Sequence, residues 1–516
     1  MTKFLFFLLF ILPIVPSYSQ ATFSKSIDVD IDADSGVAIR AVQDGYLLLA
    51  GSICFSNMLD CYSILKIDFE GNIIWKNQIN NFPYKIKPAG NYNNHGIAVN
   101  ENQDAIYYSG IIQPQGNPFD IFLMKTNNQG DSLWLKTYGG AYIDLSASVF
   151  YRTDTTLLLF GDFSLGAGND DVIWLLETDL DGNVVWEGTY GEEYGMVGRQ
   201  DIIQLANKDI VFTYLSCDQN GFCTTGDEQV LKITKIDSVG EEIWTKDVYY
   251  FDESWSNSSL VGLDDGGFLL SFYRQNFQQG WFYPPILIWL DSMGNVINQY
   301  NFPADSERTI QDLTITTSGT IIGTGYVDKF DLGFAGWVFA MSQEGELLWN
   351  REIADLRFPA KISQLNAVEE AENGGLILTG SIMDTFLNHI PAFNNQNIWL
   401  LKLDSIGCLE PGCGDVQIIS GSAEAQASNK PALFKIYPNP VNGGNKCPLE
   451  RNPAYGAAGK VDIEILDCFG RLVWKKYDSA DPLIQLETAG FQHGIYLVRI
   501  KNKQGRILQM EKLVVL

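Results

Sequence analysis

The chain has 516 residues, of which 46% are hydrophobic, 13% aromatic and 19% charged. This composition is typical of a globular protein and excludes an intrinsically disordered chain. The formal net charge of −27 excludes nucleic acid and anionic lipid as partners, because phosphate binding requires a basic face.

Residues 1–20 predict a secretory signal peptide. Lys3 precedes an apolar run over residues 4–15, and small or polar residues follow it, which is the order of such a signal with cleavage near residues 19–21. The run is too short to cross a bilayer comfortably, and no later apolar segment reaches about 18 residues. We therefore expect an exported protein without an integral membrane segment.

The cysteines are interpreted in the light of export, because an oxidising compartment favours disulfides. We expect four local pairs: Cys54–Cys61, Cys217–Cys223, Cys408–Cys413 and Cys447–Cys468. Cys408 and Cys413 have a spacing that zinc sites use, but no second pair of ligands lies near them in the sequence. The chain has only three histidines, so we expect no metal and no cofactor.

A turn sequence recurs seven times along the chain, as in TDLDGNVVW at residues 178–186. Its anchoring glycines are Gly71, Gly130, Gly182, Gly240, Gly294, Gly345 and Gly407. Each copy follows an apolar, glycine-punctuated run, and the repeat has the length of a four-stranded antiparallel blade. Residues 21–413 are therefore predicted to form a seven-bladed β-propeller.

The residue types of this turn predict a hairpin. Asp179 would accept hydrogen bonds from backbone N–H groups two or three residues on, and Gly182 would supply a positive φ. Trp186 would lie on the outgoing strand and pack between blades; Asn298 and Pro411 take its place in the fifth and seventh units. A calcium loop would need several converging oxygens, and the other copies lack the second aspartate, Asp181.

Residues 21–27 provide a prediction about closure of the ring. They resemble the strands that follow the turns, whereas the seventh unit ends in a segment with Cys408 and Pro411 that suits a fourth strand poorly. We expect residues 21–27 to supply the outermost strand of the last blade.

The carboxy-terminal part differs in sequence from the repeats. Residues 414–432 are small and polar, as in a linker, and residues 433–516 alternate like a small antiparallel β-sandwich. This module contains the following motif residues: Tyr437, Pro438, Asn439, Pro440, Gly470 of the D-x-x-G-R turn, Gly494, Tyr496 and Lys512. As a set, these motifs resemble the type A C-terminal sorting domain of the type IX secretion system of certain Gram-negative bacteria.

The resemblance implies a route and a set of partners. A signal peptide carries such proteins to the periplasm, the outer-membrane apparatus recognises the folded sandwich, and a sortase-like peptidase removes it. The cargo then stays on the cell surface or is shed. The insertion at residues 445–460 is longer than the usual loop, and a Cys447–Cys468 bond is not general in that family. Arg471 and His493 are interpreted as sandwich surface.

No sequence motif in the propeller specifies a reaction. Nucleophile elbows, zinc-protease motifs, P-loops and dinucleotide fingerprints are missing from the sequence. With His95 and His389 the only histidines of the propeller, a catalytic triad is not expected. The abundant carboxylates leave a glycosidase pair open, since sequence does not place two of them at a defined separation.

One segment of the fifth unit is unusually aromatic, at residues 272–285. Its candidate ligand-binding residues are Tyr273, Phe277, Trp281, Phe282 and Tyr283. Aromatic faces among amides suit sugar rings or peptide surfaces, although the same rings could cover the blade edge. We therefore expect a non-enzymatic binding protein for glycan or protein. The alternative is an extracellular polysaccharide-acting enzyme with carboxylates in the propeller loops.

Overall fold

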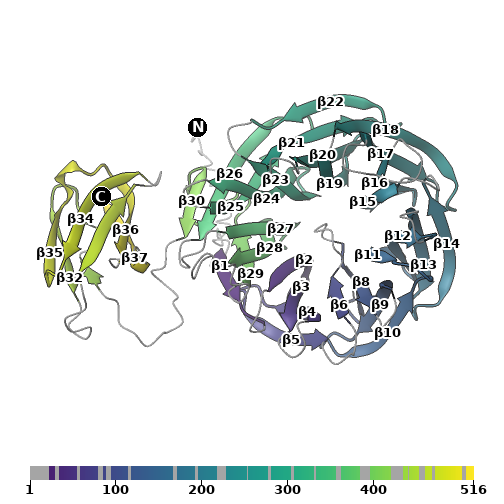
Figure 1. Cartoon of the computed structure of the whole chain (residues 1–516), viewed down its shortest axis with the longest axis horizontal. Coiled ribbons are helices and arrows are strands. Elements are labelled where there is room, and N and C mark those ends of the chain that lie inside the picture. Colours follow the sequence, from purple (N-terminus) through teal and green to yellow (C-terminus); the bar gives the residue numbers. More distant parts are fainter. Residues whose placement is uncertain are drawn as a thin grey trace, which may run out of the picture.

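A computed structural model gives the architecture. It describes residues 22–29, 34–54, 59–79, 85–88, 95–100, 102–113, 118–166, 171–191, 196–217, 228–252, 254–276, 281–303, 307–329, 333–355, 362–383, 396–419, 434–437, 439, 441–451, 460–467, 471–501 and 507–515. These residues form a ring of β-sheets and a separate small sandwich (Figure 1). The predicted all-β class is confirmed.

Seven blades surround a common axis, and successive strands of each blade lie farther from that axis (Figure 1). The sheets of the last two blades are joined by a parallel pairing of Phe334 with Ile362. Blade 1 contains β2 (Ser35–Val42), β3 (Gly45–Cys54), β4 (Leu59–Ile67) and β5 (Ile73–Ile79). Blade 2 contains β6 (Lys85–Pro88), β7 (Ile97–Val99), β8 (Ile106–Gln113), β9 (Asp120–Thr126) and β10 (Ser132–Tyr138). Blade 3 contains β11 (Leu145–Thr153), β12 (Thr156–Ser164), β13 (Asp171–Asp179) and β14 (Val184–Tyr190). In blade 2, β6 and β7 share the innermost place beside β8.

The remaining four blades repeat this plan. Blade 4 contains β15 (Met196–Gln204), β16 (Ile210–Cys217), β17 (Glu228–Ile236) and β18 (Glu242–Asp252), and blade 5 contains β19 (Ser254–Gly262), β20 (Phe268–Asn276), β21 (Trp281–Leu290) and β22 (Val296–Asn301). Blade 6 contains β23 (Arg308–Ile315), β24 (Ile321–Lys329), β25 (Gly333–Met341) and β26 (Leu347–Asp355). Blade 7 contains β27 (Ile362–Glu370), β28 (Leu376–Met383), β29 (Gln396–Leu403) and β1 (Phe23–Ile27). The predicted seven-bladed propeller is confirmed.

The ring is closed by its amino-terminal strand, as predicted. β1 pairs antiparallel with β29, from Phe23 opposite Lys402 to Ile27 opposite Ile398. The last blade therefore takes three strands from one end of the propeller and its fourth from the other end.

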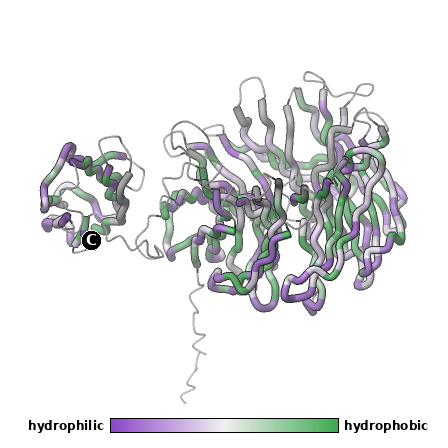
Figure 2. The backbone as a smooth tube through the Cα atoms, turned by 60° about the horizontal axis from the view of Figure 1, so that its bottom comes forward, coloured by the Kyte–Doolittle hydropathy of each residue, from purple (hydrophilic) through white to green (hydrophobic). Residues whose placement is uncertain are grey.

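The repeated turns have the geometry of tight hairpins, and Figure 2 shows them gathered along one face of the ring. Asp179 Oδ1 accepts hydrogen bonds from the N–H groups of Asp181 and Asn183, two and four residues on rather than two or three. The Asn183 amide also donates to Asp179 Oδ2. These bonds from Asn183 lower the pKa of Asp179. Gly182 has φ +74°, which a side chain would strain.

At six of the seven junctions between blades, an aromatic ring on the outermost strand of one blade covers the turn glycine of the next blade. A Cβ on Gly240 would lie 2.3 Å from Trp186, for example, and a Cβ on Gly71 would lie 2.8 Å from Phe23. The pairs are Phe23–Gly71, Trp75–Gly130, Trp134–Gly182, Trp186–Gly240, Trp244–Gly294 and Trp349–Gly407. The expected packing of the tryptophans between blades is therefore confirmed, and Phe23 performs this task for the last blade.

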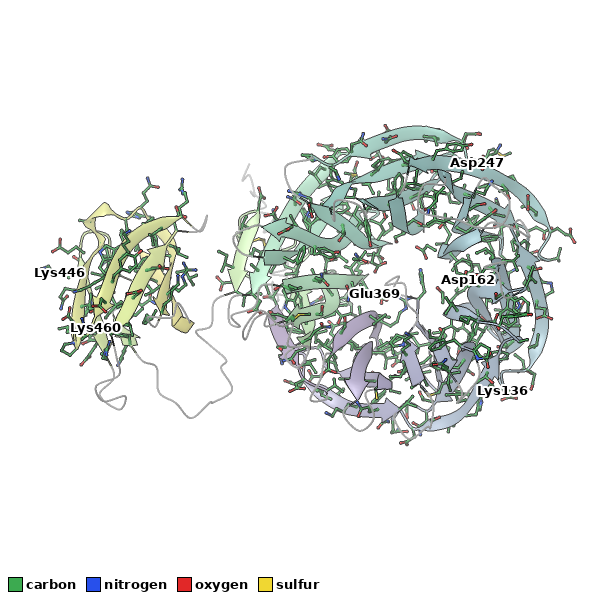
Figure 3. The ribbon with its side chains drawn as sticks, in the orientation of Figure 1. Lys136, Asp162, Asp247, Glu369, Lys446 and Lys460 are labelled. Carbon is green, nitrogen blue, oxygen red and sulfur yellow. A yellow bond between two sulfur atoms is a disulfide. The ribbon has the colours of Figure 1, made fainter. Side chains whose placement is uncertain are left out.

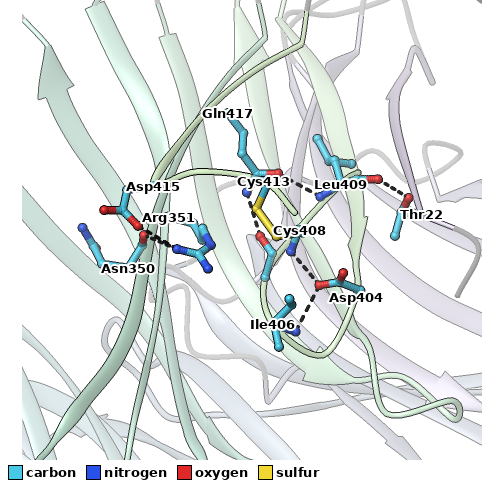
Figure 4. Close-up of a disulfide and its surroundings, with 11 residues drawn as sticks. Thr22, Asn350, Arg351, Asp404, Ile406, Cys408, Leu409, Cys413, Asp415 and Gln417 are labelled. Carbon is cyan, nitrogen blue, oxygen red and sulfur yellow. Dashed lines mark hydrogen bonds and ion pairs between the residues drawn. A yellow bond between two sulfur atoms is a disulfide. The ribbon is translucent and has the colours of Figure 1, made fainter. Parts of the chain in front are cut away.

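The segment after the last turn is tied to the propeller. β30 (Val416–Ile419) lies parallel to β26 of blade 6, so part of the segment expected to be a linker is a strand. Arg351 Nη1 lies 2.8 Å from Asp415 Oδ1, and the buried Gln417 amide donates to the carbonyl of Gly407 (Figure 4). These contacts fasten the chain to the outer edge of the ring.

The carboxy-terminal sandwich has its own core. One sheet contains β31 (Phe434–Ile436), β32 (Lys446–Arg451) and β35 (Leu483–Glu487); the other contains β34 (Leu472–Ser479), β33 (Val461–Leu466), β36 (Gly494–Lys501) and β37 (Ile507–Val515). A single 3-10 turn at Thr488–Gly490 follows β35. Leu449, Ile463, Ile465 and Leu513 are fully buried between the sheets, so the module can fold around its own apolar centre. No helix in the described residues is long and apolar enough to cross a bilayer.

Candidate functional site

Charged side chains from five blades meet on the inner side of the ring. They are Arg40 of β2, His95 before β7, Asp201 of β15, Asp312 of β23 and Glu369 of β27. Arg40 Nη1 lies 3.4 Å from Glu369 Oε2, and Arg40 Nη2 lies 3.4 Å from His95 Nδ1. His95 Nε2 lies 3.1 Å from Asp201 Oδ1. Figure 3 shows Glu369 on the inner wall of the propeller. We call these five residues the axial cluster.

Backbone bulges accompany the two buried aspartates of the axial cluster. The register of β15 shifts between Arg199 and Ile202, and that of β23 shifts between Ile310 and Asp312. A bulge adds a residue and re-aims the side chains beside it. Asp201 Oδ2 accepts the N–H of Leu260, and Asp312 Oδ2 accepts the N–H of Val368. Each aspartate thus bonds to the inner strand of the following blade.

Burial controls the electrostatics of the axial cluster. It raises the pKa of Asp312 well above the usual range of an aspartate, and the charge of Asp201 adds to this, while the Val368 N–H and Arg40 oppose it. Burial also raises the pKa of Glu369, against the opposing effect of Arg40. A raised carboxyl pKa in a polar cavity is a common property of functional sites, although ion-pair networks produce it too.

The geometry of His95 limits the chemistry of the axial cluster. His95 Nε2 contacts Asp201 Oδ1 and His95 Nδ1 contacts Arg40 Nη2, so both ring nitrogens are engaged by other side chains. Asp201 is in turn held by Leu260. A general base needs a free nitrogen within reach of a substrate proton. The arrangement therefore suits bracing of the blades better than proton transfer.

A second pair of carboxylates lies between blades 2 and 3, on the face opposite the tight turns. Asp120 begins β9 and Asp144 precedes β11. A Cβ on Gly139 would lie 2.3 Å from Asp120 Oδ1 and 2.7 Å from Asp144 Oδ2, so the two groups are close neighbours. Burial raises the pKa of both, and for Asp120 the charge of Asp144 adds to the effect. Among the described residues, no three potential metal ligands lie together.

The described parts of the aromatic segment of blade 5, on either side of residues 277–280, are paired strands. β20 and β21 continue their pairing to Asn276 opposite Trp281, with Gln275 opposite Phe282 and Arg274 opposite Tyr283. Tyr273 lies half-buried on β20. Phe277 lies outside the described residues, as do the side chains of Trp281, Phe282 and Tyr283. A common ligand surface for these residues therefore stays a prediction.

The first sorting motif of the sandwich lies beside its last strand. Asn439 Oδ1 accepts the N–H of Val514, and the N–H of Val441 donates to the Val514 carbonyl. The exposed Tyr437 donates from its hydroxyl to Glu450 Oε2 at 2.9 Å. The first motif of the module is thus joined to its last strand.

The other motif residues lie elsewhere in the sandwich. Asp467 and Arg471 close the D-x-x-G-R turn with a 2.8 Å ion pair, and the Tyr496 hydroxyl donates to the Gln492 carbonyl. Gly494 begins β36, and Lys512 of β37 pairs with Leu497 in the backbone ladder. Pro438, Pro440, Gly470 and the side chain of Lys512 lie outside the described residues.

The cysteine predictions have different outcomes. The Cys408–Cys413 disulfide is present beside the last turn (Figure 4). Cys61 is disulfide-bonded, while the side chain of its expected partner Cys54 lies outside the described residues, as do both side chains of the Cys217–Cys223 pair. Cys447 is a buried thiol, and burial raises its pKa.

The expected Cys447–Cys468 bond is therefore not formed by Cys447. Its Sγ lies 3.9 Å from the carbonyl oxygen of Tyr437, inside the sandwich core. Cys468 lies outside the described residues. The predicted bond rested on the spacing of the cysteines in the sequence. That spacing does not report the packing, which directs the Cys447 side chain into the apolar centre.

The members of the axial cluster are distant from one another in the chain, so the sequence alone does not bring them together. One signal was visible: a Gln-Asp pair occurs in the inner strand of two units, at residues 200–201 and 311–312. A charged residue at the same place in two apolar strands indicates a shared inward contact.

Comparison with known proteins identifies the carboxy-terminal module. Residues 435–516 match the family described as the Secretion system C-terminal sorting domain, which confirms the resemblance of the motifs. This domain marks the chain for export by the type IX secretion system to the cell surface. A comparison with curated proteins gives no match for the chain.

Several solved structures are similar to the propeller. A protein of unknown function from Dyadobacter fermentans is 12% identical, with a TM-score of 0.41, over 60% of this chain and 93% of that one. The β-propeller domain of the Trilobed protease from Pyrococcus furiosus is 11% identical, with a TM-score of 0.41, over 73% and 96% of the two chains. A puromycin hydrolase is 11% identical, with a TM-score of 0.44, over 72% and 55%. Similarity at this level carries no information about ligand or activity.

Proposed function

We propose that the propeller is a non-enzymatic binding protein for a glycan or protein ligand outside the cell. The observation that carries the proposal is that both ring nitrogens of His95 contact other side chains, namely Arg40 and Asp201. On the inner wall, the side chains best suited to acid–base chemistry therefore hold neighbouring blades together through these contacts. A rigid ring that presents loops is a scaffold suited to binding, and both nitrogens of His95, the histidine described on its inner wall, are contacted by other side chains.

The aromatic hairpin of blade 5 is the proposed contact surface. Its backbone is paired as far as Asn276 and Trp281, so residues on both strands are held in place before a ligand arrives. Preorganised aromatic residues bind with a small loss of conformational entropy. The hairpin also extends from the end of the blade opposite the tight turns, where the chain departs most from its repeat.

Binding and turnover on the same ligands test this proposal. The full exported chain would be tested for binding to, and cleavage of, a panel of soluble polysaccharides and surface proteins. We expect binding without turnover, and at least tenfold weaker binding after Trp281→Ala, since truncation of an aromatic hot-spot residue costs about 2 kcal/mol or more. Ile74→Ser, an exposed change in blade 1, serves as the matched control.

The competing function is a polysaccharide-acting enzyme, and the Asp120–Asp144 pair favours it. Two neighbouring carboxyls with raised pKa are the elements of a glycosidase acid and its partner. Asp144, however, already accepts hydrogen bonds from the N–H groups of Gly140 and Ser164. Turnover of a sugar that disappears in Asp120→Asn would establish the enzyme and refute the binding-only proposal.

A further inference from the structure

The junction between blades 5 and 6 contains a cavity of about 570 Å³. It lies on the tight-turn face, between the β19–β20 turn of blade 5 and the β23–β24 and β25–β26 turns of blade 6. Its size falls in the range of small-molecule sites, about 300–1,000 Å³. This face is opposite the aromatic hairpin, so the cavity is separate from the contact surface proposed above.

A change in the aromatic pattern accompanies the cavity. At six junctions an aromatic residue on the outermost strand covers the next turn glycine, but blade 5 has Asn298 at that place. Trp289 lies directly opposite Asn298 on the neighbouring strand β21. Its indole donates from Nε1 to the Gln343 carbonyl at 2.7 Å, as Trp75 donates to the Asn128 carbonyl in the usual arrangement.

Because Asn298 stands on the outermost strand, the tryptophan at this junction is Trp289, which lies one strand closer to the axis. Trp289 approaches the position of a Gly345 Cβ only to 3.4 Å, whereas rings at the other six junctions approach to between 2.3 and 2.9 Å. The outer place, which a tryptophan fills elsewhere, holds the shorter and exposed Asn298. The cavity occupies this junction because its outer side lacks an indole.

The wall of the cavity is held in place before any ligand binds. Gln343 Nε2 donates to Asp264 Oδ2 at 2.8 Å and to the Gly319 carbonyl at 3.1 Å. Gln343 Oε1 accepts the N–H of Asp264 at 2.9 Å. One amide thus fixes three turns from two blades relative to one another. Fixed polar groups favour specific binding, because less freedom is lost on association.

The lining indicates the chemical class of the ligand. It includes hydroxyl groups such as Ser342, the Asn298 amide and carboxylates such as Glu344, and among the described residues it includes no lysine, arginine or histidine. Ile297 and Leu348 contribute exposed aliphatic surface, at 59% and 50% exposure. Carboxylates without a cation disfavour phosphate, sulfate and uronic acids. Apolar surface beside hydroxyl and amide groups suits a sugar ring, which has an apolar face and a polar edge.

We propose that this cavity, which we call the blade 5/6 site, binds a neutral saccharide. Asn298 and the carboxylates would hydrogen-bond its hydroxyl groups, and Ile297 and Leu348 would contact its apolar ring face. The inference rests on the proposed binding function and specifies a ligand class and a second site for it.

The test replaces Asn298 with the tryptophan that other repeats have at the same position. Asn298→Trp introduces the residue found at five other junctions and fills the outer place. Binding of neutral oligosaccharides of glucose, mannose, galactose and xylose to the full exported chain would be measured by calorimetry. We expect one of these oligosaccharides to bind, with at least tenfold loss of affinity in Asn298→Trp and unchanged affinity in Ile74→Ser, an exposed change in blade 1. A uronic-acid oligosaccharide of equal length should bind at least tenfold more weakly than the neutral one.

A second variant guards against a folding defect. Ile297→Glu changes an exposed rim residue and adds a like charge beside the acidic lining, so its melting temperature should equal that of the wild type while its affinity falls. Neutral-saccharide binding that survives both variants would overturn the blade 5/6 site and leave the proposed function intact. Turnover of a saccharide would overturn the proposed function instead. If no neutral saccharide binds the wild type, the inference is wrong, although a protein ligand at the blade 5 hairpin would still satisfy the proposed function.

Discussion

Phe23 lies opposite Lys402 in the ladder of the last blade, and its ring covers Gly71 of the first blade. It thus takes the place that a tryptophan holds at five other junctions. Phe23→Ala should lower the free energy of unfolding by about 2 kcal/mol, since a half-buried phenylalanine contributes less than the 3–5 kcal/mol of a fully buried one. Denaturant unfolding of the full exported chain measures the change.

The exposed Ile74 provides the control for this prediction. Ile74→Ser, on the outer strand of blade 1, should shift stability by no more than about 0.5 kcal/mol. Equal losses in Phe23→Ala and Ile74→Ser would contradict a specific role of Phe23 in closing the ring.

Two turn glycines separate backbone strain from steric overlap. Gly240 has φ +93°, and an added Cβ would lie 2.3 Å from Trp186. Gly266 has φ +84°, and nothing lies within 4 Å of its Cβ position. Gly266→Ala should cost about 1–2 kcal/mol, the strain of a left-handed alanine. Gly240→Ala should cost clearly more, because Trp186 must also move.

Thermal unfolding of the two glycine variants under identical conditions provides the comparison. A melting temperature for Gly240→Ala that equals that of Gly266→Ala would show that Trp186 gives way freely. The tight packing between blades would then contribute little to stability.

Asp312 provides a prediction about pH. Because burial raises its pKa, the folded protein retains a proton that the unfolded chain loses near pH 4. Stability should therefore fall as pH rises from about 4 through the raised pKa. Asp312→Asn has no proton to lose and keeps an oxygen for the Val368 N–H, so the part of the slope due to Asp312 should disappear and the variant should be the more stable form at pH 7. The part due to other carboxyls with a raised pKa, such as Glu369, should remain.

Unfolding free energies between pH 4 and pH 8 test this expectation. Asp312→Ala removes the acceptor as well and leaves the Val368 N–H without its bond, so it should be less stable than Asp312→Asn at every pH, by about 1–3 kcal/mol. A slope as steep in Asp312→Asn as in the wild type would assign the pH dependence to other groups.

Asn439 connects the first sorting motif to the last strand of the sandwich. Asn439→Ala removes the acceptor of the Val514 N–H, whereas Asn439→Asp keeps an oxygen there. We expect Asn439→Ala to accumulate in the periplasm with at least a twofold lower surface fraction, and Asn439→Asp to be delivered like the wild type. Cell fractionation measures both, with deletion of residues 433–516 as the fully blocked control. Equal delivery of the two variants would remove this contact from the sorting signal.

The parts of the fold that depend on neighbouring residues were predictable from the sequence. A turn such as that of Asp179 and Gly182 satisfies its own hydrogen bonds, so seven copies of it indicated seven hairpins. The closing strand was predictable too, because residues 21–27 carry the pattern of the strands after those turns. The sorting motifs were recognised as a set for the same reason, since each is short and retains its spacing.

The parts that depend on distant residues were not predictable. The axial cluster joins Arg40, His95, Asp201 and Glu369, which belong to different blades, and no spacing in the chain reports their contacts. Trp289 likewise covers the junction that a tryptophan at position 298 would cover. This depends on the pairing of Trp289 with Asn298 between β21 and β22. Cys447 turns into the sandwich core, which depends on packing that cysteine spacing does not describe.

The dependence of the last blade on β1 sets an order of events in folding. The Ser24 hydroxyl accepts a hydrogen bond from the Trp399 indole, across 375 residues of sequence. A chain that emerges amino end first must keep its first strand unpaired until the seventh blade arrives. Ring closure is then the last and slowest step, because contacts so distant in sequence form late. An unclosed ring would expose both of its edges, so the periplasm is the place where this protein most needs protection from aggregation.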